Sequence, residues 1–407
     1  QNLGFSPLLY GVIAFIPRFF DAITDPVMGF ISDNTKSKWG KRRQYVFLGA
    51  IIMGISFITM WQLYIENGIV FNFWYFLFFS LIFYLGLTIF SIPFVAMGYE
   101  MSDDFHERTK IMAVSQFIGQ FAWIIAPWIW VIIYDPNIFS DPASGTRELS
   151  IYIGIACTLF AITPALFIKS KSTLDDKNLA PLTRKTLGSS FTNIFSLFKD
   201  AYKNEPFRKL CMATFLIFNS FQTIAAFSFF IIVHYLFSGD AAAAGIWPTL
   251  HGSIGALITT ILVIPLVSKM AQRYGKKYTF ILSQSISIIG YILFWFLFIP
   301  GKPYMFLYAL PFFSFGIGGL FTIMMSMTAD VCDYEELKNG LPRREGAFGA
   351  IYWWMVKLGT ALAGLFAGII MWYVGFAPDA VTQPDGALTG LRFFYTFIPI
   401  TGTSLAI

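Results

Sequence analysis

Three charged residues lie close together in an otherwise apolar segment, FIPRFFDAITDPVMGF. Arg18, Asp21 and Asp25 are spaced by three and four residues, which places their side chains on one face of a helix. A charge near the middle of a bilayer is costly unless it is paired or hydrated, so such residues are functional candidates. Two carboxylates and one guanidinium keep a net negative charge. The cluster therefore predicts a site for a small cation such as Na⁺ or H⁺.

One further charge, Lys357, lies inside the apolar segment AIYWWMVKLGTALAG. At 1.5 Å per residue, Asp25 is roughly 12 Å and Lys357 about 15 Å from the expected inner ends of their segments. This similar depth allows Lys357 to face the carboxylates. A lysine that pairs with Asp25, or yields that position to a cation, would couple two parts of the chain. Alternatively, Arg18 and Lys357 merely neutralise the two aspartates in a structural cluster.

Composition predicts a membrane protein. The chain of 407 residues is 56% hydrophobic and 13% charged, with a mean hydropathy of +0.65, whereas soluble domains carry about 25% charged residues. Apolar runs long enough to cross a bilayer, roughly 20 residues each, recur along the chain. We expect eleven spans, at 7–32, 44–65, 72–101, 109–134, 149–168, 209–237, 246–268, 279–299, 305–331, 346–374 and 390–407. The predicted fold class is an all-α polytopic membrane protein.

Basic residues predict the orientation. Most of the 28 Lys and Arg residues lie in alternate loops, those that follow residues 33, 102, 169, 269 and 334. By the positive-inside rule these loops are cytoplasmic, which predicts a bacterial inner membrane protein whose basic loops contact anionic lipid. The net charge of +5 then reflects topology. Nucleic-acid binding is not indicated, because no basic patch is interleaved with aromatic residues outside these loops.

Polar residues 170–207 divide the chain. We expect a first helical bundle at 1–169, a cytoplasmic linker at 170–207 and a second bundle at 208–407. The chain starts on the expected outer side and ends inside an apolar run, so we expect that the first helix is missing and the last is truncated. Short basic turns after Gly40 and Gly275 recur at matching places of the two halves. Two pseudo-symmetric bundles of six helices are the layout of the major facilitator superfamily.

Charged residues also mark the expected cytoplasmic ends of the spans. Carboxylates at the end of one span can pair with basic residues before the next, and separate when that side of the protein opens. The alternative is that these residues only follow the positive-inside rule and cap helices. The candidates for a cytoplasmic gate are Arg43, Glu100, Asp103, Arg108, Asp330, Asp333 and Arg344.

Three stretches together resemble the glycoside–pentoside–hexuronide:cation symporter family, whose best-known member is melibiose permease. They are FIPRFFDAITDPVMGFISDNTKSKWGKRR, SIPFVAMGYEMSDDFHERTKIMAV and MTADVCDYEELKNG with the following RREGAFGAIYWWMVKLGTALAG. The resemblance covers nearly the whole chain and implies a major facilitator fold and sugar uptake driven by Na⁺, H⁺ or Li⁺. It places Asp21 and Asp25 on the two cation-site aspartates, Thr24 on a cation-ligating position and Lys357 on the lysine of the eleventh helix.

The chain also departs from melibiose permease. Ser91 stands where that protein has an aspartate, Val95 where it has a sugar-stacking tryptophan, and Gln116 where it has a sugar-binding arginine. The resemblance therefore implies cation coupling but not galactoside specificity. Because Ser91 leaves the expected site with one carboxylate fewer, the sequence favours H⁺ coupling, and Na⁺ coupling remains an alternative.

Substrate contacts are predicted from amides and aromatic rings within the spans, since ligand sites combine such groups. Each amide could instead make a hydrogen bond between helices, and each tryptophan could pack or lie at the interface. The candidates are Gln116, Gln120, Asn219, Gln222, Trp123, Trp353 and Trp354.

The sequence contains no nucleotide-binding loop, metal-ligand spacing or nucleophile constellation, so we expect neither an enzyme nor an organic cofactor. The prediction is a secondary transporter, functional as a monomer, that couples entry of Na⁺ or H⁺ to import of a sugar, glycoside or uronate by alternating access. The alternatives are a cation-coupled transporter of an amphiphile such as a lysolipid, and a transport-inactive sensor or scaffold. Retention of Asp21, Asp25 and Lys357 together disfavours the last.

Overall fold

The structure is a computed structural model. It describes residues 4–99, 101, 105–168, 170, 172–174, 179, 181–183, 199, 202–339, 345–377, 380 and 382–407. Some side chains within these helices are not described, among them those at 105–110, 112, 113, 116, 117 and 345–347.

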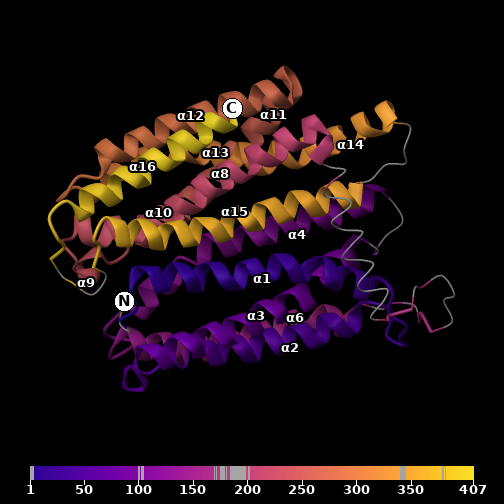
Figure 1. The fold of residues 1–407 in the computed structure, drawn as a ribbon, viewed down its shortest axis with the longest axis horizontal. Helices are drawn as coiled ribbons and strands as arrows, with labels where there is room; N and C mark the ends of the chain where they lie inside the picture. The colour runs from indigo at the N-terminus through magenta and orange to yellow at the C-terminus, as the bar shows by residue number, and fades with distance from the viewer. Residues whose placement is uncertain are drawn as a thin grey trace.

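Long helices run side by side in two groups, which Figure 1 shows one above the other. The first group follows the N-terminus. It consists of α1 (Pro7–Asp33), α2 (Arg43–Met60), a short turn (Ile65–Asn67), α3 (Gly68–Tyr99), α4 (Phe105–Ile125), α5 (Trp128–Ile133) and α6 (Pro142–Phe167).

The second group contains the remaining helices and, among the described residues, three π-helical segments that continue them. Its helices are α8 (Glu205–Phe230), α9 (Ala241–Ala244), α10 (Trp247–Ile258), α11 (Ile264–Tyr274), α12 (Lys276–Leu297), α13 (Leu310–Gly319), α14 (Met325–Asn339), α15 (Glu345–Tyr373) and α16 (Ala387–Ala406). The π-helical segments are Ile231–Leu236, Thr259–Val263 and Leu320–Met324, and a 3₁₀ segment, Pro303–Ala309, precedes α13.

Every predicted span coincides with helix, so the predicted all-α membrane fold is confirmed. Among the described residues, nine helical segments are long and apolar enough to cross a bilayer. The other two predicted spans are α4 with α5, whose apolar part Ile118–Ile133 is shorter, and α16. The predicted span at 109–134 is broken between Ile125 and Trp128, because Pro127 has no N–H to continue the hydrogen-bond ladder.

Side-chain caps fix where several helices begin. Ser6 caps α1 and Pro7 follows at its first position, while Asp141 and Pro142 repeat this arrangement at α6. The Asp141 carboxylate accepts from the backbone N–H groups of Ala143 and Ser144 at 2.8 and 2.9 Å. These hydrogen bonds hold the pKa of Asp141 below its usual value.

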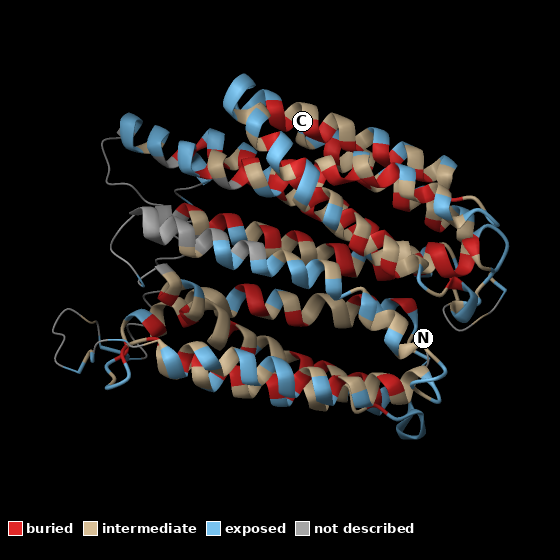
Figure 2. Cartoon of the chain, turned by 180° about the vertical axis from the view of Figure 1, so that it is seen from behind, coloured by how far each residue is buried: buried red, intermediate tan, exposed pale blue. Residues whose placement is uncertain are grey.

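Packing within each group buries residues along most of the long helices (Figure 2), whereas the described side chains of α4 are half-buried or exposed. α2 packs against α3 and α6, and α1 against α3; in the second group α8 packs against α15 and α16, and α12 against α13. The second group has two large apolar clusters, which contain fully buried side chains such as Phe207, Phe227 and Phe294. The two groups meet along α1 and α15, and along α4 and α5 with α10.

The predicted linker at 170–207 falls largely outside the described residues. Where it is described, Thr173 contacts the turn that follows α1: its hydroxyl donates to the Thr35 carbonyl oxygen at 2.9 Å, and its N–H to that of Ser37 at 3.1 Å. The linker is therefore attached to the same end of the protein as the loop between α1 and α2.

Candidate ion site between the two helix groups

Helices α1 and α15 run antiparallel and approach very closely at one end. A Cβ atom added at Gly368 would lie 2.5 Å from the Pro7 carbonyl oxygen, and one added at Gly364 would lie 2.7 Å from the Ala14 Cβ. Real Cβ atoms do not come so close to a neighbour, so this contact requires glycine. The face of α1 that makes it continues at spacings of three and four through Arg18, Asp21 and Asp25.

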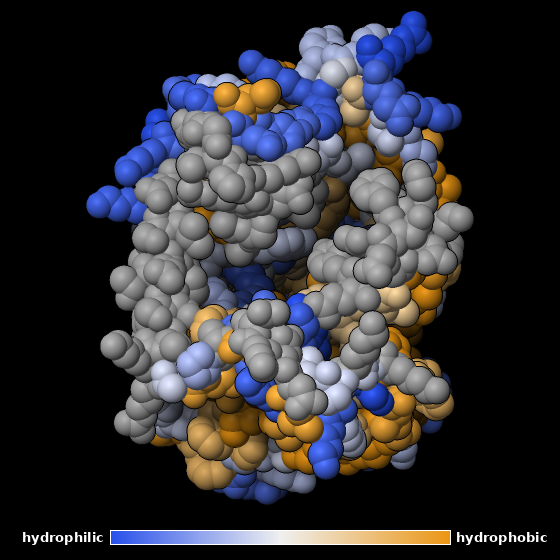
Figure 3. Space-filling model, turned by 90° about the vertical axis from the view of Figure 1, so that its right-hand side faces the viewer, coloured by the Kyte–Doolittle hydropathy of each residue, from blue (hydrophilic) through white to orange (hydrophobic). Residues whose placement is uncertain are grey.

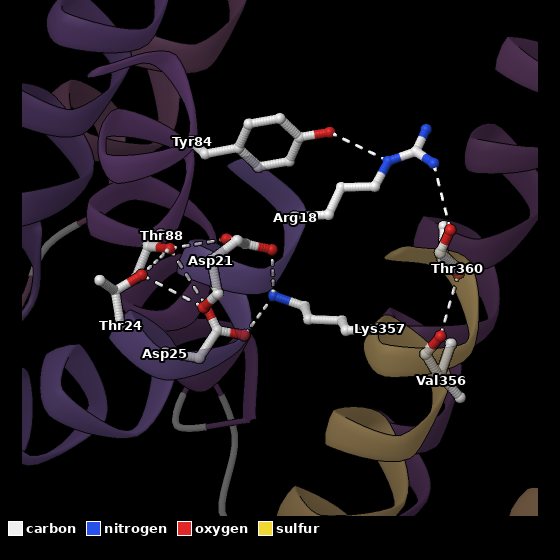
Figure 4. A network of polar contacts seen from close by, with 9 residues as sticks. All are labelled: Arg18, Asp21, Thr24, Asp25, Tyr84, Thr88, Val356, Lys357 and Thr360. Carbon is white, nitrogen blue, oxygen red and sulfur yellow. Dashed lines mark hydrogen bonds and ion pairs between the residues drawn. The ribbon is translucent and has the colours of Figure 1, made fainter. Parts of the chain in front are cut away.

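Beyond the glycines, long polar side chains occupy the space between the two helices (Figure 4). The Lys357 Nζ donates to Asp21 Oδ2 at 2.7 Å and also to Asp25 Oδ2. The side chains of Lys357, Asp21 and Asp25 are 28%, 7% and 19% exposed, so this charge group is largely shielded from solvent. The structure thus brings together the three residues that the similar depths in the sequence placed opposite each other.

Two hydroxyl groups extend the site toward α3. The Thr88 Oγ1 lies 2.7 Å from Asp21 Oδ1, 3.1 Å from Asp25 Oδ1 and 3.1 Å from Thr24 Oγ1. The Thr24 hydroxyl is also 3.1 Å from the Asp21 carbonyl oxygen. Each of these hydroxyl groups has only one proton to donate, so the carboxylate, carbonyl and hydroxyl oxygens of the cluster outnumber the hydroxyl protons that could bind them.

A cluster with surplus oxygen acceptors suits a hard cation or a proton. Carboxylate and hydroxyl oxygens are the ligands that such cations prefer. The Lys357 ammonium is the positive charge that these carboxylates bind in this structure. A cation entering between Asp21 and Asp25 would compete with that ammonium.

Arg18 lies on the same face of α1 but does not neutralise the aspartates. Its Nε donates to the Tyr84 hydroxyl and its Nη1 to the Thr360 carbonyl oxygen, both at 3.4 Å. It makes no ion pair with any carboxylate among the described residues. Arg18 therefore bridges α1, α3 and α15 as a separate positive group, in contrast to the alternative in which it belongs to a neutralised structural cluster.

Two of the predicted substrate amides bind α15. The Asn219 Nδ2 donates to the Gly359 carbonyl oxygen and the Gln222 Nε2 to the Thr360 hydroxyl, both at 3.4 Å. Gln120 of α4 instead connects the two groups, because its Oε1 accepts from the Thr260 hydroxyl at 3.3 Å. These bonds match the interhelical alternative, and Thr360, which binds Gln222 through its hydroxyl, also accepts from Arg18 through its carbonyl oxygen.

The predicted aromatic contacts differ in their surroundings. Trp353 precedes Lys357 by one helical turn on the same face of α15, and its side chain is 46% exposed. Trp354 is half-buried, and Trp123 of α4 is 62% exposed. The side chain of Gln116 is outside the described residues. Trp353 is thus the aromatic candidate on the face that carries the charge group.

Two of the gate candidates, Arg43 and Asp330, bind within their own helix group. Arg43 donates to the Ala165 carbonyl oxygen at the end of α6, with its Nε at 2.8 Å and its Nη2 at 2.6 Å. Asp330 pairs with Lys276 at 2.6 Å. Asp333 is exposed on α14. The remaining candidates lie outside the described residues or have side chains that are not described: Glu100, Asp103, Arg108 and Arg344.

Sequence reasoning missed Thr88 and Tyr84. Ser80, Tyr84 and Thr88 recur every four residues in an otherwise apolar stretch of α3, which puts three hydroxyl groups on one helix face. This four-residue spacing of hydroxyl side chains is the sequence pattern that could have identified Thr88 and Tyr84. Ser91, which replaces an aspartate of melibiose permease, is half-buried one turn beyond Thr88.

The two ends of the interface differ. At the end where α1 meets the glycines of α15, the Ser253 hydroxyl of α10 donates to the Ile124 carbonyl oxygen at 2.6 Å, and Thr249 donates to that of Pro127 at 2.8 Å. Figure 3 views the opposite end, the one at which Thr173 binds the turn after α1, and shows a recess between the groups with hydrophilic surface inside it.

Comparison with known proteins agrees with this architecture. The family model described as MFS/sugar transport protein matches residues 1–407. The glucuronide carrier protein homolog of Escherichia coli (strain K12) is 24% identical over 404 residues, which cover 97% of this chain and 82% of that protein. The putative glycoside/cation symporter YagG of the same organism is 21% identical over 401 residues, covering 98% and 82%.

Among solved structures, a mutant form of the nucleoside transporter NupG matches with a TM-score of 0.66 at 15% identity, over 99% of this chain and 91% of that one. These findings confirm the resemblance that the sequence suggested and the all-α transporter fold. The chain is an integral membrane protein of the MFS/sugar transport protein family, and it is a transporter, not an enzyme.

Proposed function

We propose that this chain is a cation-coupled symporter that imports a sugar, a glycoside or a uronate together with Na⁺ or H⁺. The observation that carries the proposal is the charge group that joins Lys357 of α15 to Asp21 and Asp25 of α1. The names of the relatives support it, since they describe a glucuronide carrier homolog and a putative glycoside/cation symporter.

The proposed mechanism uses competition at the two carboxylates. A cation bound by Asp21, Asp25 and Thr88 weakens the ion pairs that Lys357 of α15 makes with the two aspartates of α1. Because α1 and α15 belong to different helix groups, the occupancy of the site then biases how the groups pack against each other. Transport of the cation and the substrate is coupled if the protein switches between its inward-open and outward-open forms only when both are bound or neither is.

The proposed orientation places the linker and the basic loops in the cytoplasm of a bacterial cell, with the protein in the inner membrane. The recess in Figure 3 then opens inward, and the end closed by Gly364 and Gly368 faces outward. In this reading the structure is an inward-open state of a carrier that works as a monomer within lipid.

The experiment is counterflow and concentrative uptake in proteoliposomes that contain the purified protein. Radiolabelled sugars, glycosides and uronates are compared with and without a Na⁺ gradient and with and without a pH gradient. We expect at least one of them to accumulate with one of the two gradients. Uptake of a lysolipid in place of every sugar, or no gradient-driven uptake at all, would overturn the proposal.

A further inference from the structure

Two arginines occupy matching places in the two helix groups. Arg147 is the sixth residue of α6 and Arg392 is the sixth residue of α16, and these are the last described helices of their groups. The Arg147 Nη1 donates to the Leu63 carbonyl oxygen, just beyond α2, at 3.0 Å. The Arg392 Nη2 donates to the Trp295 carbonyl oxygen, near the end of α12, at 2.6 Å. Each guanidinium thus binds the backbone at the end of a neighbouring helix.

Aromatic rings flank both guanidinium groups. The Arg147 Cζ lies 4.7 Å from the centre of the Tyr64 ring. The Arg392 Cζ lies 4.0 Å from the centre of the Tyr235 ring and 4.7 Å from that of Trp295. A ring face attracts a cation and fixes the guanidinium plane, but it carries no net charge. The rings therefore position the two guanidinium groups without neutralising them.

Neither arginine makes an ion pair with a carboxylate in the part of the chain that the structure describes. Asp141 caps α6 and is engaged there: hydrogen bonds from Ser144 contribute most to its low pKa, and the charge of Arg147 contributes least. A guanidinium has five N–H donors, and each of the two uses one of them on a described acceptor. Both sites keep a positive charge and free donors for an anion.

Both sites lie at one end of the protein. The chain passes from α5 to α6 and from α15 to α16 at the end where Gly368 approaches Pro7, which we call the glycine end. The sixth residue of a helix lies roughly 7.5 Å from the first. Helix α6 has 26 residues, so about 4–5 Å of it extends beyond each side of a ~30 Å apolar core when it is centred there. An arginine at this depth reaches the headgroup layer with its side chain.

The two sites face lipid on opposite flanks of the protein. Helix α2 packs against α6, and α12 packs against α16. Figure 1 shows these two pairs at opposite sides, away from the interface between the groups. Large apolar side chains beside the arginines are exposed, among them Tyr64 and Phe296. In a bilayer such surfaces contact acyl chains, so an anion that reaches either guanidinium there belongs to a lipid.

We propose that each helix group binds one phospholipid at the glycine end, with the lipid phosphate on Arg147 in the first group and on Arg392 in the second. A phosphodiester supplies the negative charge that both sites lack and accepts charge-assisted hydrogen bonds from the guanidinium. Tyrosine and tryptophan rings favour the same headgroup level. The acyl chains lie along the exposed flanks of the two helix pairs. This assignment is independent of which sugar or ion the protein carries.

The test is native mass spectrometry of the purified protein, stripped of lipid and titrated with phosphatidylglycerol. We expect two lipids on the parent chain, one on Arg147→Gln or Arg392→Gln, and none on the double variant at the same lipid concentration. Lys302→Gln is the matched control, because Lys302 is an exposed basic residue in the loop after α12 at the same end, and it should keep both lipids. Two lipids on the double variant would overturn the proposal.

Two competitors identify the part of the lipid that is bound. Glucosyl diacylglycerol has acyl chains but no phosphate, so we expect it to bind roughly tenfold more weakly than phosphatidylglycerol, since it cannot make charge-assisted hydrogen bonds to the guanidinium. Equal binding would overturn the proposal. Millimolar inorganic phosphate should leave both lipids in place, and their displacement would mean that the arginines bind free phosphate instead.

A purely structural role gives a different result. If the arginines only clamp neighbouring helices, Arg147→Gln and Arg392→Gln would lower thermal stability in lipid-free detergent while both lipids stay bound, and the proposal would fail. Arg147→Lys and Arg392→Lys keep the charge but lose the planar fork. We expect these variants to retain both lipids at lower affinity than the parent chain and at higher affinity than the glutamine variants.

Discussion

Lys357 and Asp21 are 336 residues apart in the sequence, and their side-chain nitrogen and oxygen atoms lie 2.7 Å apart in the structure. The contact joins the last long helix but one to the first. An ion that took the place of this lysine, as proposed, would therefore act on the packing of the two helix groups, and not only on a local pocket.

Asp25→Asn should abolish ion-driven accumulation and preserve part of the substrate counterflow. The amide keeps the shape of the side chain but removes one of two charges available to the cation. Concentrative uptake and counterflow, measured on the same preparation, separate the two effects. Asp33→Asn is the control, because Asp33 pairs with Arg42 at the end of the same helix. Full concentrative uptake by Asp25→Asn would show that this carboxylate does not hold the coupling ion.

Thr88→Val should weaken cation binding, because it removes the hydroxyl that lies between the two carboxylates. Hydrogen bonds to charged groups contribute about 1.5–3 kcal/mol, which corresponds to roughly 10- to 150-fold in ion affinity. The ion concentration that gives half-maximal uptake measures the effect. Thr88→Ser should behave like the parent chain. Thr401→Val removes a hydroxyl whose hydrogen bonds, in the part of the chain that the structure describes, go to carbonyl oxygens of its own helix, and serves as the control. An unchanged half-maximal concentration for Thr88→Val would exclude this oxygen as a ligand.

Lys357→Gln should strengthen cation binding and slow accumulation. The carboxylates lose the ammonium that competes with the ion, so we expect half-saturation at a concentration lower by about tenfold, the effect of roughly 1.4 kcal/mol. Ion-dependent thermal stabilisation of the purified protein gives the affinity, and vesicle uptake gives the rate. Lys209→Gln breaks the exposed pair with Glu205 in the first turns of α8 and should change neither quantity. Weaker ion binding in Lys357→Gln would mean that the lysine supports the site and does not compete for it.

A disulfide between positions 14 and 364 should stop transport. The Cβ atoms at these positions come within 2.7 Å when one is built at Gly364, and a disulfide needs about 3.8 Å, so a small separation of the helices admits the bond. In a chain whose own cysteines (Cys157, Cys211 and Cys332) are replaced, Ala14→Cys with Gly364→Cys should lose uptake on oxidation and regain it with a reductant. Ala14→Cys alone is the control. Continued uptake by the cross-linked protein would show that this end does not open during transport.

The charge group was the part of the site that the sequence predicted best. Asp21, Asp25 and Lys357 could be placed at similar depth because charges are rare in apolar spans and the helical rise is constant. The helices could also be predicted, because a long apolar segment in a bilayer must satisfy its backbone hydrogen bonds internally, and a helix does so.

Other features depended on packing that the spacing of residues does not determine. Arg18 shares the face of Asp21, but its long side chain reaches Tyr84 and Thr360 instead of the carboxylates. Thr88 carries no charge, so its place between two aspartates became evident only when α3 was packed against α1. The π-helical segments, such as Thr259–Val263, also continue apolar runs whose residue spacing is that of an ordinary helix.

The hydrogen bonds from Thr249 and Ser253 to the carbonyl oxygens of Pro127 and Ile124 have a consequence for hydration. When that end of the protein separates, these two oxygens lose their hydroxyl donors, and lipid offers none in exchange. Water must enter to solvate them, so the open form contains more water than the closed form. An impermeant osmolyte on that side should therefore lower the population of the open form and slow the transport cycle, even at a fixed gradient of ion and substrate.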